Sequence, residues 1–426
     1  MKAGAILLAL ALFLFPATLA AQAPHYELKL DDRDPMRVDF SLVDPSAGEA
    51  RLALPPSKEA LLVSAPACGA KPLVRTGPGR WTRPAGCASV SWSARLDDAD
   101  KGMDSTRPPP GAWSRRHLLW LLTGQLPWLK SGRPWPAPIS VSARLGGRRL
   151  SKSAEIRPAA PFYLAVGQPV RFYRADGFTM RVYGDAPKGE RADRLQRLVA
   201  ATLARWHRDV VPARVTPPDH LDVAWVKAPA GAEAGFFASA SSDAVLMQYV
   251  PDPDAADPGA KLEAGLLLTG LHEGFHTLEE WIGGGRRAWI AESWATFFAW
   301  EAGRRHLKGA PLAEAAGFVD APADTPILQA EREVEKDDQT HYDLFYNKGT
   351  RFWEAIEAVL DGPANGSGRL SALIRATDGM KGLDWDDAGR IAAFLDARSH
   401  GRAGPIVRCY LVETGCPEAK AVPGAP

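Results

Sequence analysis

The segment His272-Glu273-Gly274-Phe275-His276 constrains this chain more than any other, because it places an H-E-x-x-H pattern in an apolar run that we predict to be helical. Residues four apart lie on one face of an α-helix, so both imidazoles point the same way and could bind one zinc ion. Glu273 follows the first histidine, where a general base for a metal-bound water is needed. The pattern predicts a zinc site with a catalytic carboxylate; the alternative is a buried helix whose two histidines are hydrogen-bonded.

A catalytic zinc site needs a third protein ligand, and a second helix must supply it. Glu280 shares the face of the two histidines but lies about 12 Å along the helix axis from His272, too far for one metal ion. Three glycines at 283–285 end the first helix, and residues 288–303 form a second apolar helical run. Glu292 is a single acid in the aromatic, apolar first part of that run, where a carboxylate is costly to bury unless it is paired or binds metal. We therefore expect Glu292 to be the third ligand.

The first residues of the chain have the features of a secretory signal peptide. Lys2 precedes an apolar run at 5–15, and Pro16 and small residues follow as far as Ala23. That run is too short to span a bilayer comfortably, and no later segment is apolar for long enough to cross a membrane. We expect residues 1–21 to be removed and the mature chain to be periplasmic or secreted, without a membrane span.

Charge and cysteine content narrow the possible partners. Fifty-one basic and fifty acidic residues give a net charge of +1, so nothing in the balance indicates a nucleic-acid partner. Four cysteines allow three pairings, and nearness in sequence favours Cys68–Cys87 and Cys409–Cys416. An exported chain can keep such disulfides, and we interpret them as structural.

The pattern of hydrophobic residues divides the mature chain into three parts. Residues 22–157 alternate in short runs separated by proline and glycine, which predicts an all-β, sandwich-like domain. Residues 158–265 combine strand patterns with an amphipathic helix at 190–210, which indicates an α/β lobe. Residues 266–426 are predicted to be a helical lobe that carries the zinc ligands and ends in a disulfide-pinned tail. Four tryptophans of the β domain could form a substrate wall or pack between domains: Trp113, Trp120, Trp128 and Trp135.

The zinc segments resemble those of the gluzincin metallopeptidases, in which a glutamate on the next helix follows H-E-x-x-H. The segment from Trp289 to Ala295 is similar to the W-x-x-E-G-x-A of the aminopeptidase N and glycyl aminopeptidase families, with Ser293 in the place of glycine. The fifteen residues between His276 and Glu292 are fewer than in the aminopeptidase N family. The resemblance implies an α+β multidomain chain in which a thermolysin-like zinc peptidase domain follows the β domain.

Two further segments bear on the same resemblance. Tyr346-Asn347-Lys348-Gly349 resembles the Y-x-K-G of both families, whose tyrosine stabilises the oxyanion. The acid that these families offer to the substrate amine aligns near Ser239, and the nearest acids are Glu233 and Asp243. Aminopeptidase and endopeptidase activity therefore both remain open. In such enzymes the sheet edge binds extended substrate, and we expect 244–248 to be that edge strand.

The charged run 331–343 is interpreted as a solvated face, and for His341 and Tyr342 both a site role and local packing remain open. We expect no PDZ domain of the kind that many glycyl aminopeptidase relatives carry, because the residues after position 401 are too few to form one.

These patterns together predict an exported zinc metallopeptidase acting on peptide or protein substrates. His272, His276 and Glu292 would hold the zinc, and Glu273 would take a proton from the bound water as it attacks the peptide carbonyl. The zinc and Tyr346 would share the developing negative charge. The alternatives are a catalytically inactive metallopeptidase-like binding protein of the cell envelope, and a structural envelope protein whose histidines are merely buried. The oligomeric state is left open.

Overall fold

The structure is a computed structural model of the whole chain. It describes residues 24–31, 33–34, 36–44, 48–103, 109–114, 118–130, 137–145, 148–156, 163–241, 243–279, 281–283, 287–319 and 324–414. The predicted signal peptide, Glu280, Trp135 and Cys416 lie outside these ranges. In the part that is described, no helix is long and apolar enough to cross a membrane.

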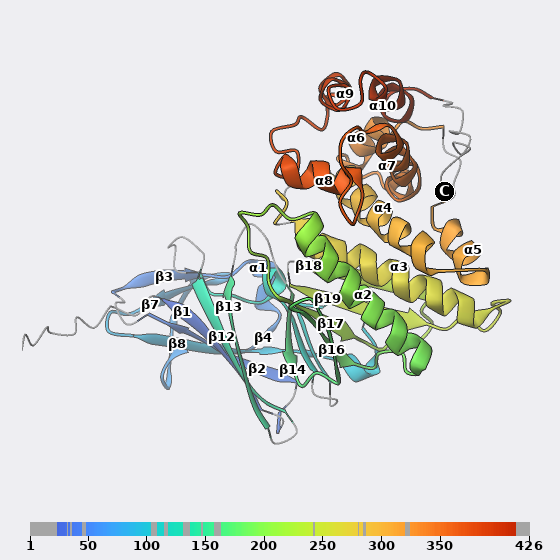
Figure 1. Cartoon of the computed structure of the whole chain (residues 1–426). Coiled ribbons are helices and arrows are strands. Elements are labelled where there is room, and N and C mark those ends of the chain that lie inside the picture. The colour runs from blue at the N-terminus through green and yellow to red at the C-terminus, as the bar shows by residue number, and fades with distance from the viewer. Residues whose placement is uncertain are drawn as a thin grey trace, which may run out of the picture.

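The N-terminal part of the chain is built from β-strands, as the alternating pattern predicted (Figure 1). A seven-stranded sheet has the order β13-β12-β1-β2-β8-β4-β5, and a three-stranded sheet has the order β3-β7-β6. The strands are β1 (His25–Asp31), β2 (Arg37–Val43), β3 (Ala50–Ala53), β4 (Leu62–Cys68), β5 (Lys71–Pro72), β6 (Val74–Gly77), β7 (Arg80–Arg83), β8 (Ser89–Arg95), β12 (Ala137–Leu145) and β13 (Arg148–Ile156), with one short helix, α1 (Pro56–Glu59). Cys68 and Cys87 form the predicted disulfide, with 5.9 Å between their Cα atoms.

Aromatic side chains fill the core of this β region. Phe40 stacks on Trp92 with 5.4 Å between the ring centroids, and Trp128 meets Phe40 edge-on at 5.5 Å. Trp120 packs on Tyr163 with ring centroids 4.7 Å apart. Trp113 and Trp128 thus belong to the core of the β region, and Trp120 belongs to a separate core that the five-stranded sheet also joins, so only Trp120 packs between domains as one of the two interpretations expected.

A four-stranded sheet of order β14-β11-β10-β9 links the β region to the rest of the chain. Its strands are β9 (Asp97–Asp98), β10 (Gly111–Ser114), β11 (Leu118–Leu122) and β14 (Tyr163–Gly167), and the single turns η1 (Ala99–Lys101) and η2 (Thr123–Gln125) flank them. Because β14 pairs with β11, the sheet includes residues beyond position 157.

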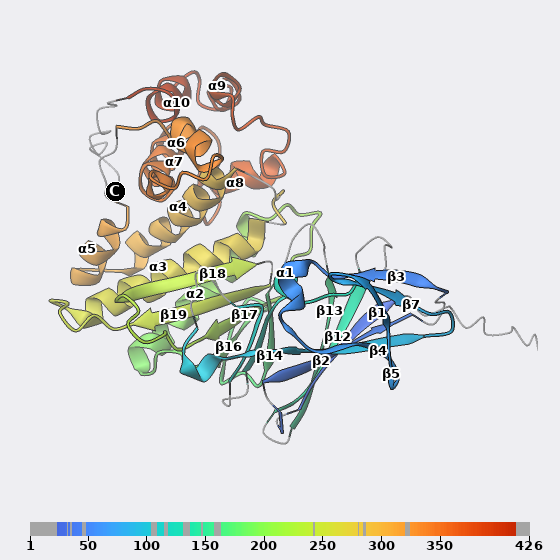
Figure 2. The same cartoon turned by 180° about the vertical axis from the view of Figure 1, so that it is seen from behind.

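The next part of the chain forms a five-stranded sheet of order β15-β16-β17-β19-β18. Its strands are β15 (Arg171–Ala175), β16 (Phe178–Gly184), β17 (His220–Trp225), β18 (Gly235–Ser241) and β19 (Ala244–Val250). Alternate side chains face opposite sides: Val223 and Val245 join the core under the helices, and Ala224 and Leu246 join a core against the four-stranded sheet. Figure 2 shows the helices on one side of this sheet.

The expectation that 244–248 is the edge strand is wrong. This segment is β19, which lies inside the sheet between β17 and β18. The chain turns back after Ser241, and β18 pairs antiparallel with β19, with Ala238 opposite Met247. The small side chains of β18 gave no clear alternating pattern, so the sequence did not reveal that one more strand covers the predicted edge.

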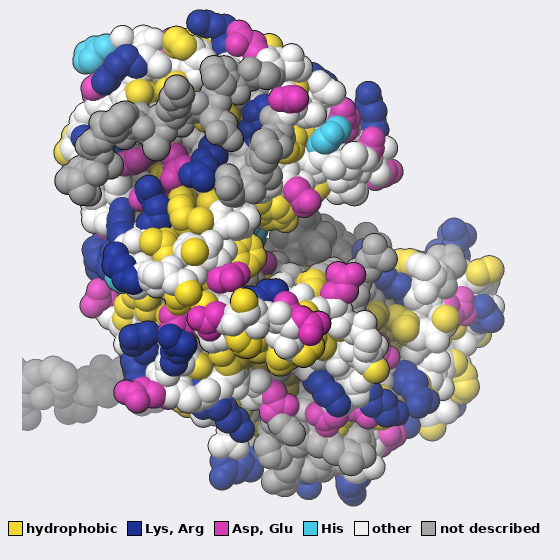
Figure 3. Space-filling model, turned by 90° about the vertical axis from the view of Figure 1, so that its right-hand side faces the viewer, with side chains coloured by type: hydrophobic (Ala, Val, Ile, Leu, Met, Phe, Trp, Pro, Cys, Tyr) yellow, Lys and Arg dark blue, Asp and Glu magenta, His cyan; other side chains and the backbone are white. Residues whose placement is uncertain are grey.

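Helix α2 (Glu190–Asp209) lies in the chain between β16 and β17, where an amphipathic helix was predicted. The part of the chain that is described beyond β19 is helical, as predicted. Its elements are α3 (Pro258–Glu279), α4 (Ala288–His306), α5 (Ala310–Gly317), α6 (Ile327–Val334), η3 (Tyr342–Phe345), α7 (Asn347–Val359), α8 (Arg369–Ala376), α9 (Ala388–Asp396) and α10 (Ala403–Leu411). Helices α2 and α3 cover the sheet, and the C-terminal helices lie beyond α4. The space-filling view shows the surface hollowed between the upper part, formed by the C-terminal helices, and the sheets below (Figure 3).

Candidate metal centre

The start of helix α3 and its contact with α2 set the position of the two histidines. Asp257 accepts a hydrogen bond from the backbone N–H of Ala260 at 2.9 Å, and Pro258 occupies the first turn, which is a favourable helix start. Gly274, inside the H-E-x-x-H segment, lets α3 approach α2 closely. A Cβ at this position would lie 2.6 Å from a methyl carbon of Leu203.

Helix α4 is held at its start by a buried side chain from α6. The carboxylate of Glu331, only 4% exposed, accepts hydrogen bonds from the backbone N–H groups of Ala288 and Trp289 at 3.2 and 3.0 Å. A negative charge at a helix N-terminus is stabilising, and the Glu331 carboxylate supplies it at the first residues of α4. These residues lie one turn before the metal ligand Glu292. The solvated-face interpretation of 331–343 is therefore wrong for Glu331, although most of the run is exposed.

The two helices bring the three predicted metal ligands together. The Nε2 atoms of His272 and His276 lie 3.0 Å apart, and Oε2 of Glu292 lies 3.1 Å from the first and 3.3 Å from the second. Among the described residues this is the one group of three His, Cys, Asp or Glu side chains whose ligand atoms lie this close together.

The triangle of ligand atoms fits a zinc ion. In a tetrahedral site with bonds of about 2.0–2.1 Å, neighbouring ligand atoms lie about 3.3 Å apart. Two imidazole nitrogens 3.0 Å apart can form a hydrogen bond with each other only if one of them carries a proton. A metal cation between them would instead accept the lone pairs of both nitrogens. Two imidazoles and one carboxylate are a donor set typical of catalytic zinc.

A second layer of polar groups orients the ligands. The hydroxyl of Thr296 donates its proton to the carbonyl of Glu292 at 2.8 Å, so at 3.1 Å it accepts the N–H of His272 Nδ1. This arrangement leaves a lone pair on Nε2 of His272 for the metal. Nδ1 of His276 lies 3.1 Å from a carboxylate oxygen of Glu279.

Glu292 is held by a tyrosine as well as by the imidazoles. The hydroxyl of Tyr342 donates to Oε1 of Glu292 at 2.9 Å, which leaves Oε2 facing the histidines. Burial opposes ionisation of Glu292, but the neighbouring imidazoles outweigh it and hold its pKa well below the ordinary value. Tyr342 therefore contacts the site, one of the two possibilities that the sequence left open.

Glu273 and Tyr346 both line a cavity of about 390 Å³ beside His272. Burial raises the pKa of Glu273 above its ordinary value, while the two nearby imidazoles oppose that rise. The Tyr346 ring centroid lies 5.6 Å from that of His272. Burial raises the pKa of the Tyr346 phenol, and the charge of Glu292 raises it further, so the hydroxyl keeps its proton.

The position of Tyr346 depends on a close contact between α7 and α4. A Cβ on Gly349 would lie 2.5 Å from Cβ of Ser293, so glycine is what lets the two helices touch there. The hydroxyl of Ser293, which stands where the resembling families have glycine, accepts a hydrogen bond from the Trp353 indole at 2.8 Å. The Y-x-K-G glycine thus has a packing role next to the metal ligands.

The acids that sequence reasoning considered for a substrate amine are not gathered at the metal ligands. Asp243 lies beside Asp222, whose carboxylate pairs with Lys152 at 2.6 Å and Arg181 at 2.5 Å. Burial raises the pKa of Asp243. Glu233 is exposed in the turn before β18.

The position that aligns with the family acid is occupied by a pair of hydroxyls. Ser239 on β18 forms a hydrogen bond with the hydroxyl of Tyr163 from β14, and the charge of Glu273 helps to raise the pKa of that phenol after burial. The backbone N–H of Tyr163 donates to Ser241 at 2.7 Å. The β region thus contributes a side chain close to the site, which the sequence did not reveal because 163 and 239 are far apart in the chain.

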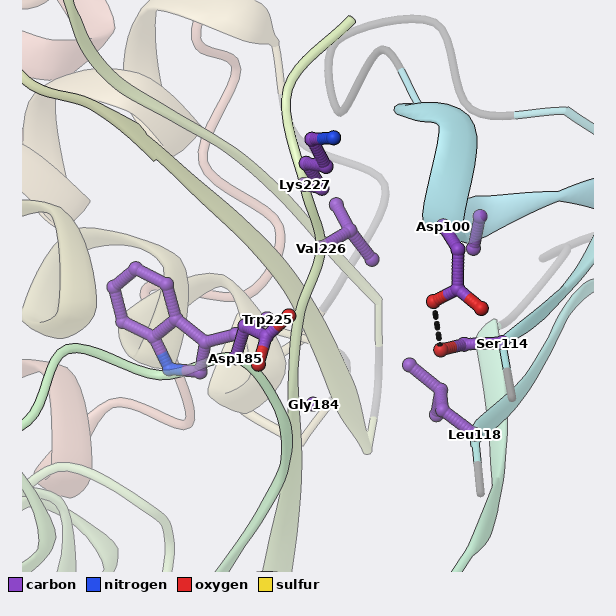
Figure 4. A pocket seen from close by; sticks show the side chains of 9 residues that line it. Asp100, Ser114, Leu118, Gly184, Asp185, Trp225, Val226 and Lys227 are labelled. Atoms are coloured by element: carbon purple, nitrogen blue, oxygen red, sulfur yellow. Dashed lines mark hydrogen bonds between the residues drawn. The ribbon is translucent and has the colours of Figure 1, made fainter. Parts of the chain in front are cut away.

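A second cavity, of about 310 Å³, lies between the β region and the five-stranded sheet (Figure 4). Its wall includes Asp100, Ser114, Trp225 and Lys227, and Ser114 donates a hydrogen bond to Asp100 at 2.5 Å. None of the three metal ligands lines it, so it is separate from the metal group.

No protein-family model and no curated protein matches this chain. Among solved structures, an aminopeptidase N family protein from Idiomarina loihiensis aligns with a TM-score of 0.61 and 10% sequence identity, over 92% of this chain and 76% of that chain. A GH20 exo-β-N-acetylglucosaminidase from Vibrio harveyi aligns with a TM-score of 0.12 and 11% identity, over 58% of this chain and 36% of that chain, which is no likeness of fold. The first comparison shows the fold: a mixed α+β chain with several sheets and a helical C-terminal part, like that aminopeptidase N family protein.

Proposed function

We propose that this protein is a zinc-dependent metallopeptidase of the gluzincin type. The observation that carries the proposal is the triangle of ligand atoms from His272, His276 and Glu292, with sides of 3.0–3.3 Å. One of these ligands, His272, lines the same cavity as Glu273. The fold likeness to an aminopeptidase N family protein supports a peptidase-like function.

The chain's own residues divide the chemistry of peptide hydrolysis between them. Zinc, when bound, would supply a Lewis acid that polarises the carbonyl and acidifies a water molecule. Glu273 accepts a proton as the water attacks the peptide carbonyl carbon, and then passes that proton to the leaving amine. Thr296 and Tyr342 keep the ligands His272 and Glu292 in place while this happens.

Tyr346 donates a hydrogen bond to the carbonyl oxygen as negative charge develops there. Tyr346 lies at the start of α7 and lines the same cavity as Glu273, with its ring centroid 5.6 Å from that of His272. Such a contact is stronger in the transition state than in the ground state, which is the condition for raising the rate.

Strand β18 is the proposed binding edge for extended substrate. It is the outer strand of its sheet, and Phe236 and Ala238 line the cavity. A peptide added along this edge would pair its backbone with β18 and place side chains alternately into the cavity and away from it.

We also propose that the mature protein is exported and that its substrate needs no free N-terminal amine. The predicted signal peptide and the disulfide Cys68–Cys87 support export. The hydroxyl pair of Tyr163 and Ser239, in place of a carboxylate, supports cleavage away from a free terminus.

A digest of a mixed peptide library, read by mass spectrometry, tests this function. The zinc-loaded protein should produce new peptide termini, and the same protein freed of metal by a chelator should produce none until zinc is restored. Zinc-loaded protein that leaves every peptide intact would contradict the proposal.

A further inference from the structure

The cavity beside Glu273 is lined by apolar and polar side chains together, and the polar ones include Thr269, Thr296 and Asn347. Leu268, Ala299, Trp300 and Val319 are buried in its wall, each no more than 7% exposed. Phe318 and Asp343 are the exposed members of its lining. A group that enters the cavity therefore meets an apolar part of the wall, uncharged polar side chains, and one exposed carboxylate.

The charge of this lining is acidic. Of the described residues that line the cavity, Glu273 and Asp343 are the acids, and none is lysine or arginine. Glu273 is assigned to the chemistry, so Asp343 is the carboxylate that remains for recognition.

Asp343 is unpaired in the part of the chain that the structure describes. Arg351, two turns further along, pairs instead with Glu354 at 2.8 Å, and Glu354 also accepts the indole N–H of Trp300 at 2.8 Å. His341, two residues before, lies against Glu333 at 2.5 Å. Arg351 and His341 thus have other partners, as does Lys348, whose Nζ donates to the carbonyl of Thr325, and Asp343 is exposed where it lines the cavity.

Resting on the peptidase function proposed above, we propose that this cavity selects a lysine or arginine side chain of the substrate, with Asp343 as the specificity-determining residue. The methylene stem of such a side chain suits the apolar wall, and its cationic end suits the carboxylate at the rim. An aspartate or glutamate side chain is disfavoured, because it would bring a second negative charge beside Asp343.

The test uses alanine-based peptides that carry one lysine, one norleucine or one glutamate at each position in turn, with free and with acetylated N-termini. Norleucine keeps the lysine stem and lacks the ammonium. The zinc-loaded proteins are the wild type, Asp343→Asn, Asp343→Lys and the control Asp337→Asn, which removes the same charge from an exposed residue outside the cavity lining. Cleavage is measured as kcat/KM, and binding is measured by calorimetry with each protein also carrying Glu273→Gln.

At one peptide position, lysine should be preferred over norleucine by about two- to fivefold, the range of an exposed ion pair. The lysine preference should disappear in Asp343→Asn, and it should persist in the control Asp337→Asn. In Asp343→Lys it should change to a preference for glutamate over norleucine. The lysine preference of the wild type should be the same for peptides with free and with acetylated N-termini. The inference is overturned by equal treatment of lysine and norleucine, by a lysine preference that survives Asp343→Asn, or by an effect of Asp343 on the free N-terminus alone. Binding that shows the preference without any cleavage by the wild type would overturn the peptidase function and keep the charge selection.

Discussion

Tyr342 and Tyr346 lie one turn apart and both contact Glu292, but only Tyr346 also lines the cavity that Glu273 lines. Tyr346→Phe should leave the zinc content normal and KM nearly unchanged, and should lower kcat by ~10²–10³-fold, the size seen when one oxyanion donor is lost. Steady-state kinetics with elemental analysis measures both quantities.

Tyr342→Phe is the matched comparison, and it should behave differently. Loss of a hydrogen bond to a ligand typically weakens metal affinity by ~10–100-fold, so excess zinc should restore the activity of this variant. A large kcat loss in zinc-saturated Tyr342→Phe, with little loss in Tyr346→Phe, would mean that the roles of the two tyrosines are exchanged.

His207, near the end of α2, makes stability depend on pH in a predictable direction. Its ring packs on Phe178 at 4.8 Å, and burial lowers its pKa to about 4. Between pH values of about 6.5 and 4 the unfolded chain binds a proton here that the folded chain does not, so stability falls as pH falls through this window. At pH 5 the free energy of unfolding should be lower by about 2 kcal/mol than at neutral pH because of His207, and the substitution His207→Phe should remove this pH-dependent loss. Denaturant unfolding across this pH window measures the effect, and equal pH slopes for both proteins would contradict it.

At the scale of elements, the contact between α4 and α7 positions the ligand Glu292 and Tyr346 together. Gly349→Ala would push a Cβ to 2.5 Å from Cβ of Ser293, so it should destabilise the fold by about 1–3 kcal/mol. Adding Ser293→Gly removes the opposing carbon and should recover part of that loss. Gly317→Ala is the control, since open space surrounds that helical glycine. Thermal unfolding of Gly349→Ala, of Gly349→Ala combined with Ser293→Gly, and of Gly317→Ala measures these changes in stability. If Gly349→Ala lowers the stability equally with and without Ser293→Gly, the contact between the two Cβ atoms is not the cause.

The sequence predicted the elements that carry strong periodicity and missed contacts between distant segments. The amphipathic pattern of α2 and the spacing of His272 and His276 were readable because each depends on one helix. The edge strand β18 was missed because its small residues give no pattern. The buried cap from Glu331, the hydroxyl pair at Ser239 and the acid at Asp343 depend on chain segments that meet only in the folded protein.

At the scale of the whole molecule, zinc should stabilise the fold, because the ligands converge from two helices only in the folded state. Removing the metal with a chelator should lower the Tm of the wild type, and restoring zinc should raise it again. His276→Ala should bind no zinc at the site, and its Tm should not respond to the chelator. Calorimetry together with elemental analysis tests this, and full zinc content in His276→Ala would place the site elsewhere.

The most direct test of the central claim is the hydrolysis rate of zinc-loaded Glu273→Gln compared with that of the wild type at equal zinc content. Glu273 is assigned to proton transfer and not to metal binding, so the variant should keep one zinc per chain and its fold. Its rate on a peptide that the wild type cleaves should be lower by ~10²–10⁴-fold or more. A wild-type rate in this variant would contradict the account.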